Sequence, residues 1–323
     1  MTSIRAHVAA ASLALAGAAF AQGNPPAGAA KAPDATPPSA AAPAAKPAPK
    51  AAKAAPPPGS VVQAVQAPAW IERDGGKIPA APGMSLKQND ELHTGANARL
   101  WVGTPDGSVV KMGENGTVAL ERAMLGKDRT FHAALKVIQG AFRFTTEALA
   151  KFRGKRDVAV TIGTVTAGIR GTDLWGKSAA DKQIVCLIEG KIDLTPPGEA
   201  AIAMDQPLSF YVREKDQSQP VAPVPPEQLK VWAAETETEA GKGVARRGGK
   251  WKIVVSSKSA GAALKTYEDI RSAGYAAELQ PTKVNDKRVY IVQLTSFASK
   301  ADADAAAKSL KDQGKLRDYK VAG

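Results

Sequence analysis

Two stretches near the C-terminal end of the 323-residue chain repeat one pattern of apolar and polar positions. Residues 251–257 and 290–296 each begin with an aromatic residue, continue with branched apolar residues and end in hydroxyl side chains, which is typical of strands. Apolar positions at helical spacing follow each run, and Gly274 and Gly314 predict where the two helices end. The helical positions are Leu264, Tyr267 and Ile270 in the first half and Ala303, Ala306, Ala307 and Leu310 in the second.

Shorter strand candidates follow these two helices, at 276–280 and at 317–321. Residues 250–323 are therefore predicted to form two strand–helix–strand halves related by an internal repeat.

The apolar residues of the middle region, from Gly59 to about Tyr211, follow the two-residue period of strands. Turn-forming Gly, Asn, Asp and Pro separate the runs, and little helical spacing occurs before Pro226. The pattern predicts an all-β domain over 59–239 that ends in a short helix, 227–239, packed back on the strands. A glycine-rich linker is predicted at 240–249. The candidate strands are 61–65, 98–102, 108–112, 117–120, 141–145, 158–162, 172–176, 184–188 and 191–194.

The first 58 residues predict export and a tether. Residues 1–21 combine an early arginine, an apolar stretch and the ending Ala19-Phe20-Ala21, which is typical of a cleavable signal peptide. Residues 22–58 consist mainly of Pro, Ala and Lys and predict a disordered linker. No later segment is apolar enough to span a membrane, so the protein is expected in the periplasm.

The C-terminal repeat resembles the SPOR domain, and the best match lies in Tyr290-Ile291-Val292, Ser296-Phe297 and a second helix opened by Ser299 and Asp302. The resemblance implies a ferredoxin-like α+β fold whose open sheet face binds peptidoglycan glycan strands stripped of their stem peptides.

Five residues are the candidate glycan contacts on that face. Val254 and Ile291 occupy the places where the family typically carries a Gln and an Arg, and Ser257 matches the hydroxyl of the family's first strand. Lys252 and Gln293 are expected to share the open face with Ser257.

The middle region resembles the FecR domain. The resemblance rests on 82–86, 89–95, 100–102 with 106–108, and 164–172, where Arg170, Gly171 and Thr172 form the most specific element, followed by 189–192. It implies a periplasmic β-rich interaction module, closed as a sandwich or wound like a solenoid. Family members include membrane-crossing regulators of sigma factors. That function is not carried over here, because the chain shows neither the cytoplasmic segment nor the membrane helix.

Two short motifs match enzyme formulas without the structure that those enzymes need. Residues 171–178 fit the P-loop formula, but a strand candidate at 184–188 follows where a phosphate-binding helix would be required. Ser108 and Lys111 fit the Ser-x-x-Lys of acyl enzymes, but residues three apart in a strand point to opposite faces. The sequence therefore favours a protein that is not an enzyme.

Other reactive or aromatic residues favour structural roles. Cys186, the only cysteine, has apolar neighbours and is expected to be a buried small side chain rather than a reactive thiol. Trp70, Trp101 and Trp175 either pack in the core, which is favoured, or line a sugar-stacking groove. Arg170 is expected to hold a turn more than to bind a ligand. No metal or cofactor is expected, because the three histidines lack ligand partners at metal spacing.

The net charge of +12 suits an anionic wall polymer or membrane surface as well as simple solvation. Secretion disfavours nucleic acid as a partner. We therefore expect a multidomain, non-catalytic protein that binds peptidoglycan, for example at the division septa of a Gram-negative cell, with envelope or division proteins as further partners. The alternative is an envelope signalling accessory whose FecR-like domain senses a protein or a small ligand.

Overall fold

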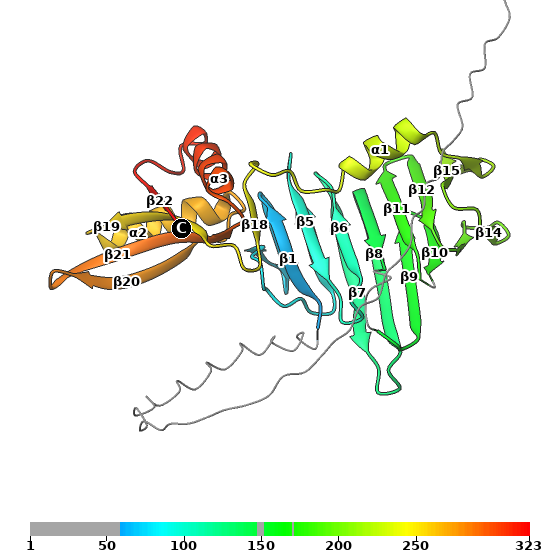
Figure 1. The fold of residues 1–323 in the computed structure, drawn as a ribbon, viewed down its shortest axis with the longest axis horizontal. Coiled ribbons are helices and arrows are strands. Elements are labelled where there is room, and N and C mark those ends of the chain that lie inside the picture. The colour runs from blue at the N-terminus through cyan, green and yellow to red at the C-terminus, as the bar shows by residue number, and fades with distance from the viewer. Residues whose placement is uncertain (1–58, 147–151, 170) are drawn as a thin grey trace, which may run out of the picture. The chain divides into compact units, whose positions relative to one another are not determined.

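The computed structural model describes residues 59–146, 152–169 and 171–323. The predicted signal peptide, the predicted linker at 22–58 and Arg170 lie outside the described residues. The described chain is mainly β, with three helices among its described elements (Figure 1). The predicted domain limits 59–239, 240–249 and 250–323 stay predictions, although separate apolar cores draw their residues from 62–211 and 253–316.

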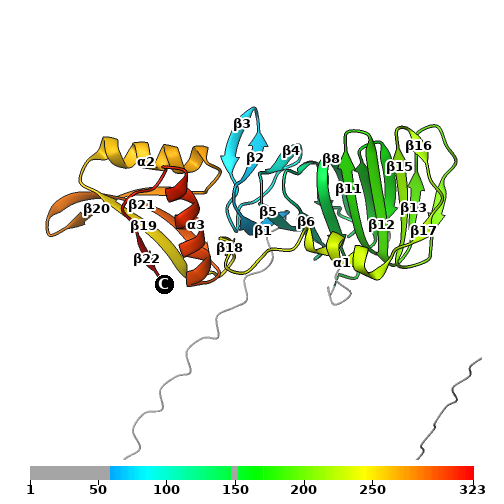
Figure 2. The same ribbon diagram turned by 90° about the horizontal axis from the view of Figure 1, so that it is seen from above.

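The first core lies between two sheets, which we call sheet A and sheet B (Figure 2). Sheet A joins strands in the order β18 (Val244–Arg246), β1 (Val61–Gln66), β5 (Arg99–Gly103), β6 (Val109–Met112), β8 (Phe131–Thr145), β11 (Asp173–Ala179), β12 (Lys182–Glu189) and β15 (Ser209–Glu214). The short strands β16 (Gln217–Ser218) and β17 (Ala222–Pro223) both pair with β15.

Sheet B joins β3 (Gly76–Pro79), β2 (Ala69–Arg73), β4 (Asp90–Thr94), β7 (Thr117–Leu125), the first half of β8, β9 (Arg156–Ile162), β10 (Val165–Ile169), β13 (Ile192–Thr195) and β14 (Ile202–Met204). All these pairs are antiparallel except β8 with β9, which is parallel. Within each sheet, neighbouring strands therefore follow one another nearly in chain order.

The chain alternates between the two sheets as it advances: β1 lies in sheet A, β2 to β4 in sheet B, and β5 and β6 in sheet A again. The long strand β8 passes from sheet B to sheet A near Gly140, whose φ is +87°. A Cβ at Gly140 would lie 2.6 Å from the Cα of Gly116, so only glycine fits this crossing. The domain is thus a sandwich in cross-section and solenoid-like in its winding, which answers the choice that the sequence left open.

Helix α1 (Pro226–Ala234) covers the outer face of sheet A, as expected. Trp232 stacks on Trp175 of β11, with ring centroids 4.8 Å apart. The helix ends five residues before the predicted Glu239. The following acidic side chains instead form ion pairs with the sheet, between Glu235 and Lys177 and between Glu237 and Lys111.

The C-terminal residues form β19 (Trp251–Ser257), α2 (Ala260–Ser272), β20 (Glu278–Val284), β21 (Lys287–Phe297), α3 (Lys300–Asp312) and β22 (Lys320–Ala322). The strands pair in the order β22–β19–β21–β20, all antiparallel. Both helices contribute to one apolar core on the sheet. This order is consistent with the expected ferredoxin-like arrangement.

The internal repeat is visible in the helix ends. Ser259 and Ser299 each cap a helix by accepting a hydrogen bond from the third following amide, and Gly274 and Gly314 follow the helices with φ of +83° and +70°. The expectation that Ser299 opens the second helix is confirmed.

The predicted linker at 240–249 holds strand β18, which pairs with β1 and, through Ala245, with Phe297 of β21. The buried carboxylate of Asp302 accepts hydrogen bonds from the amides of Gly241 and Val244, at 2.8 and 3.1 Å. Sheet A is therefore joined to the C-terminal sheet through β18.

Candidate functional site

The face of the C-terminal sheet that points away from α2 and α3 is the first candidate site, and we call it the open face. In β19, Ile253 and Val255 pack against the helical side. Lys252 and Val254 therefore point to the open face. In β21, Val292 and Leu294 pack in the core, and so Ile291 and Gln293 lie on the open face. The structure thus brings together four of the five expected residues.

Ser257 is placed differently from the prediction. It has the same parity in β19 as Ile253 and Val255, so its side chain lies on the helical side of the sheet. Its Oγ donates to the carbonyl oxygen of Ser259 and accepts from the Ser259 amide, at 3.0 and 3.2 Å. The expectation that Ser257 shares a face with Lys252 was wrong, because residues five apart in a strand point to opposite sides.

Further residues on the open face were missed from the sequence. Ser256 is exposed and pairs with Ile291, while Gln280 of β20 lies on the other side of Ile291. Lys320 of β22 pairs with Val254. The alternation of side chains along β19, counted from Lys252, indicates Ser256. Gln280 and Lys320 could not be predicted, because no local sequence pattern shows which strands β20 and β22 pair with.

The open face carries a polar centre and a cationic edge. Gln293 donates from Nε2 to Oε2 of Glu278 at 3.0 Å. Lys252 and Lys320 are exposed neighbours on β19 and β22, and neither forms a salt bridge within the described part of the chain. Such a surface can donate and accept hydrogen bonds and can pair with a carboxylate.

The described part of the FecR-like element has a structural environment. Thr172 is buried where the chain passes from β10 to β11, and its carbonyl oxygen accepts from the Thr146 amide at 3.1 Å. Gly171 has φ +101°, and a Cβ at Gly190 would lie 2.6 Å from the Gly171 carbonyl oxygen. The turn therefore requires glycine at positions 171 and 190. A ligand-binding role for this element stays a prediction.

The enzyme-like motifs do not assemble. Residues 173–179 form strand β11, and the next element is strand β12 rather than a helix. Ser108 is buried and donates to Asp106 at 2.6 Å, whereas the Lys111 ammonium lies 4.2 Å from the Trp101 ring. Among the residues described, no group of His, Cys, Asp or Glu has the arrangement of a metal site.

The three tryptophans do not form a common groove. Trp175 is fully buried against α1, Trp101 donates from its indole to the carbonyl oxygen of Thr236 at 2.9 Å, and Trp70 lies beside Gly274. Cys186 is fully buried below α1, and burial raises the pKa of its thiol to about 12. The prediction that Cys186 is a buried side chain is confirmed.

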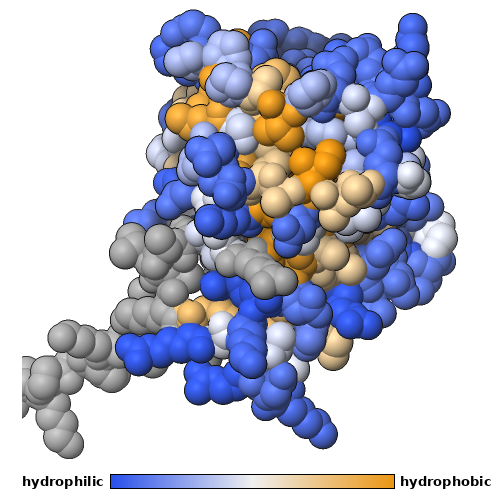
Figure 3. All heavy atoms as spheres, turned by 90° about the vertical axis from the view of Figure 1, so that its right-hand side faces the viewer, coloured by the Kyte–Doolittle hydropathy of each residue, from blue (hydrophilic) through white to orange (hydrophobic). Residues whose placement is uncertain are grey.

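An apolar area covers the end of the sandwich that carries β14 and β15 (Figure 3). Leu208 is 47% exposed and Val221 is 37% exposed. No helix within the described ranges 59–146, 152–169 and 171–323 has the length and apolarity to cross a bilayer.

Comparison with known proteins gives two family matches. Residues 248–319 match the SPOR domain, and residues 90–193 match the FecR protein family. SPOR domains act in the cell envelope, and both families consist of binding or regulatory modules.

No curated protein matches the chain. Among solved structures, the chain is similar to two crystal structures, at 2.50 and 1.65 Å resolution, of a candidate anti-sigma factor from Parabacteroides distasonis ATCC 8503. Both are 13% identical and cover 70% of this chain and 92% of their own, with TM-scores of 0.37 and 0.36. The two family matches occur in the predicted order, and the chain is therefore a FecR-domain protein with a C-terminal SPOR domain.

Proposed function

We propose that the SPOR domain binds peptidoglycan glycan strands on its open face and holds the FecR domain at the cell wall. The observation that carries this proposal is the grouping of Lys252, Val254, Ile291 and Gln293 on one face of the sheet, which neither α2 nor α3 covers. A glycan lying there meets hydrogen-bonding side chains at Gln293 and Ser256 and apolar surface at Val254 and Ile291. The protein acts in the periplasm without catalysis, and division septa are a place where such strands accumulate.

The positive charge of the open face supports the binding of glycan strands that lack stem peptides. Removing a stem peptide leaves a free lactyl carboxylate on the sugar that carried it. Lys252 and Lys320 form no salt bridge among the described residues, and we expect their ammonium groups to pair with such carboxylates. Exposed charge pairs contribute about 0.2–1 kcal/mol each, so these lysines favour stripped strands without dominating the affinity.

The test is sedimentation of the full chain with isolated peptidoglycan sacculi, before and after an amidase removes the stem peptides. Binding is expected to rise after the amidase treatment. Gln293→Ala and Lys252→Glu should each weaken binding about 5-fold, because a hydrogen bond or an exposed charge pair contributes roughly 1 kcal/mol. Ser257→Ala is the matched control, because Ser257 lies in the same strand as Lys252 but on the opposite side of the sheet. This variant should bind as the unchanged protein does.

A second role is favoured by the apolar end of the sandwich at Leu208 and Val221. In this role the FecR domain recognises an envelope protein there and acts as a signalling accessory, with the SPOR domain as a spacer. The sacculus experiment separates the two roles. If the unchanged protein binds neither sacculus preparation, glycan binding is excluded and the FecR domain becomes the recognition unit.

A further inference from the structure

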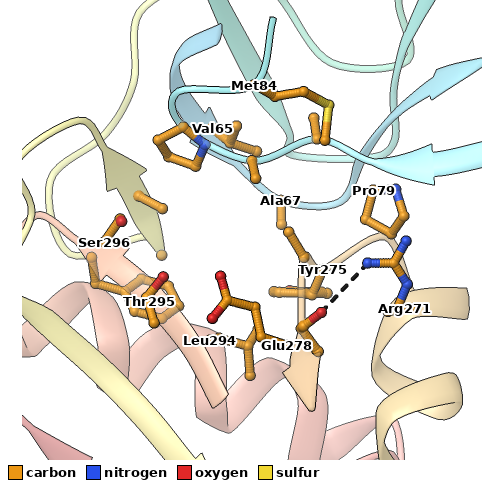
Figure 4. A pocket seen from close by; sticks show the side chains of 18 residues that line it. Val65, Ala67, Pro79, Met84, Arg271, Tyr275, Glu278, Leu294, Thr295 and Ser296 are labelled. Carbon is orange, nitrogen blue, oxygen red and sulfur yellow. Dashed lines mark hydrogen bonds between the residues drawn. The ribbon is translucent and has the colours of Figure 1, made fainter. Parts of the chain in front are cut away.

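A cavity of about 370 Å³ lies between the FecR domain and the edge of the C-terminal sheet where β20 begins (Figure 4). Glu278, Leu294, Thr295 and Ser296 line it from the SPOR side, and the loop containing Met84 lines it from the FecR side. Neither domain forms this cavity alone.

Two residues of the cavity also belong to the open face. Thr295 has the same parity in β21 as Gln293, and Glu278 both lines the cavity and accepts the hydrogen bond from Gln293 at 3.0 Å. A chain-like ligand lying along Ile291 and Gln293 would therefore reach the cavity with its next unit.

A β-bulge shapes the rim of the cavity. Thr295 and Ser296 together oppose Lys252, because the register of β21 shifts between Ile253 and Trp251. Ser296 has φ +68°, which is uncommon for a residue other than glycine. A Cβ on the neighbouring Gly249 would lie 2.1 Å from the Ser296 carbonyl oxygen, so glycine is required for this packing. Bulges redirect side chains and occur often beside binding sites.

The lining of the cavity suits a sugar ring. The carboxylate of Glu278 accepts hydrogen bonds, the hydroxyls of Thr295 and Ser296 donate and accept, and Met84 offers apolar surface to a ring face. Small-molecule pockets have volumes of about 300–1,000 Å³, and this cavity is at the lower end, where one sugar unit fits.

We propose that this cavity is a carbohydrate subsite that binds one sugar of a glycan strand whose neighbouring sugars lie on the open face. The proposal rests on the proposed function of that face. It assigns a direct ligand-binding contribution to the FecR domain, so the two domains recognise one polymer together.

The test measures the affinity of the full chain for soluble glycan strands released from amidase-treated sacculi. Ala81 is half-buried and lines the cavity from the FecR side, so Ala81→Trp fills the cavity without changing the SPOR domain. We expect about 10-fold weaker binding, because the strand loses the contacts of one sugar, which contribute roughly 1.4 kcal/mol. Ala200→Trp is the matched control, since Ala200 is exposed in a loop away from the cavity, and its affinity should not change.

A second, smaller substitution tests the subsite in case Ala81→Trp does not fold. Thr295→Val keeps the shape of the side chain and removes the hydroxyl, and it should weaken binding about 5-fold. If Ala81→Trp and Thr295→Val bind as tightly as the unchanged protein while Gln293→Ala binds more weakly, the subsite is refuted and the open face remains the binding site. If the unchanged protein binds no glycan, both the proposed function and the subsite are refuted.

Discussion

Cys186 shows how one residue depends on the layers around it. It lies on β12 with its side chain toward α1, in a cluster with Trp175 and Trp232. Its neighbours Val185 and Leu187 point into the core between the two sheets. The strand is therefore buried on both faces, and the thiol has no contact with water.

The burial of Cys186 predicts a stability that falls at high pH. Desolvation raises the pKa of the thiol from 9.0 to about 12, a rise to which nearby Asp173 adds and which Arg143 opposes. The stability contributed by the protonated thiol is complete below pH 9. Between pH 9 and 12 the unfolded chain releases this proton while the folded protein retains it, so the free energy of unfolding decreases as the pH rises.

The measurement is urea unfolding as a function of pH, with Cys186→Ala as the control. Above pH 9 the stability of the unchanged protein relative to Cys186→Ala should fall by up to about 1.4 kcal/mol per pH unit. A parallel pH dependence of both proteins would contradict the assignment.

Individual residues also show the limits of strand periodicity. Alternation within β19 and β21 places Lys252, Val254, Ile291 and Gln293 on one face, although the sequence analysis took Val254 and Ile291 from family positions and grouped Lys252 and Gln293 with Ser257. The match of Ser257 to a family position was a poorer guide than alternation, which indicates Ser256. The subsite residues Glu278 and Ala81 could not be predicted, because they become neighbours only through packing of the two domains.

At the scale of elements, α1 is held by aromatic stacking rather than by a broad apolar face. Trp232 is the buried residue of this helix, and it contacts Trp175 face to face and Phe210 at a steep angle. The ion pairs of Glu235 and Glu237 continue the contact beyond the helix end. The helix thus closes the outer face of sheet A above Cys186.

Trp232→Ala should therefore destabilise the protein by about 3–5 kcal/mol, which is typical of removing a buried large aromatic side chain. It should also increase the rate at which iodoacetamide modifies Cys186. Val231→Ala is the matched control, because Val231 is the preceding residue of the same helix and is 57% exposed. Equal unfolding midpoints for the two variants would show that the stacking contributes little.

At the scale of the whole described molecule, sheet A and the C-terminal sheet are joined through β18. A second contact reinforces this junction: the Ala69 amide donates to the Gly274 carbonyl oxygen at 3.2 Å. Gly274 approaches the FecR domain so closely that a Cβ would lie 2.6 Å from atoms of Pro68 and Trp70. The glycine that ends α2 is therefore also a contact between the two domains.

This dual role predicts different results at the two equivalent helix ends. Gly274→Ala and Gly314→Ala should each lose about 1 kcal/mol, because φ is positive at both positions, and Gly274→Ala should lose more because its Cβ would clash with Pro68 and Trp70. A Cβ at Gly314 meets nothing within 4 Å, so Gly314→Ala is the matched control. Only Gly274→Ala should speed hydrogen exchange in β1 and β18. Identical exchange in both variants would show that the junction does not depend on this contact.

The sequence by itself determined the local elements. The two-residue period of 59–211, the repeated strand–helix–strand pattern of 250–323 and the helix-ending glycines depend on residues close in the chain, and such signals survive without knowledge of the fold. The family resemblances added the order of the two domains, since their motifs are contiguous.

Only the tertiary structure decided which strands are neighbours. The alternation between sheets A and B, the pairing of β18 inside a predicted linker, the early end of α1 and the cavity beside Thr295 all depend on contacts between residues far apart in sequence. A strand's period shows which side chains share a face, but the partner across the sheet is selected by packing and backbone hydrogen bonding of the complete fold.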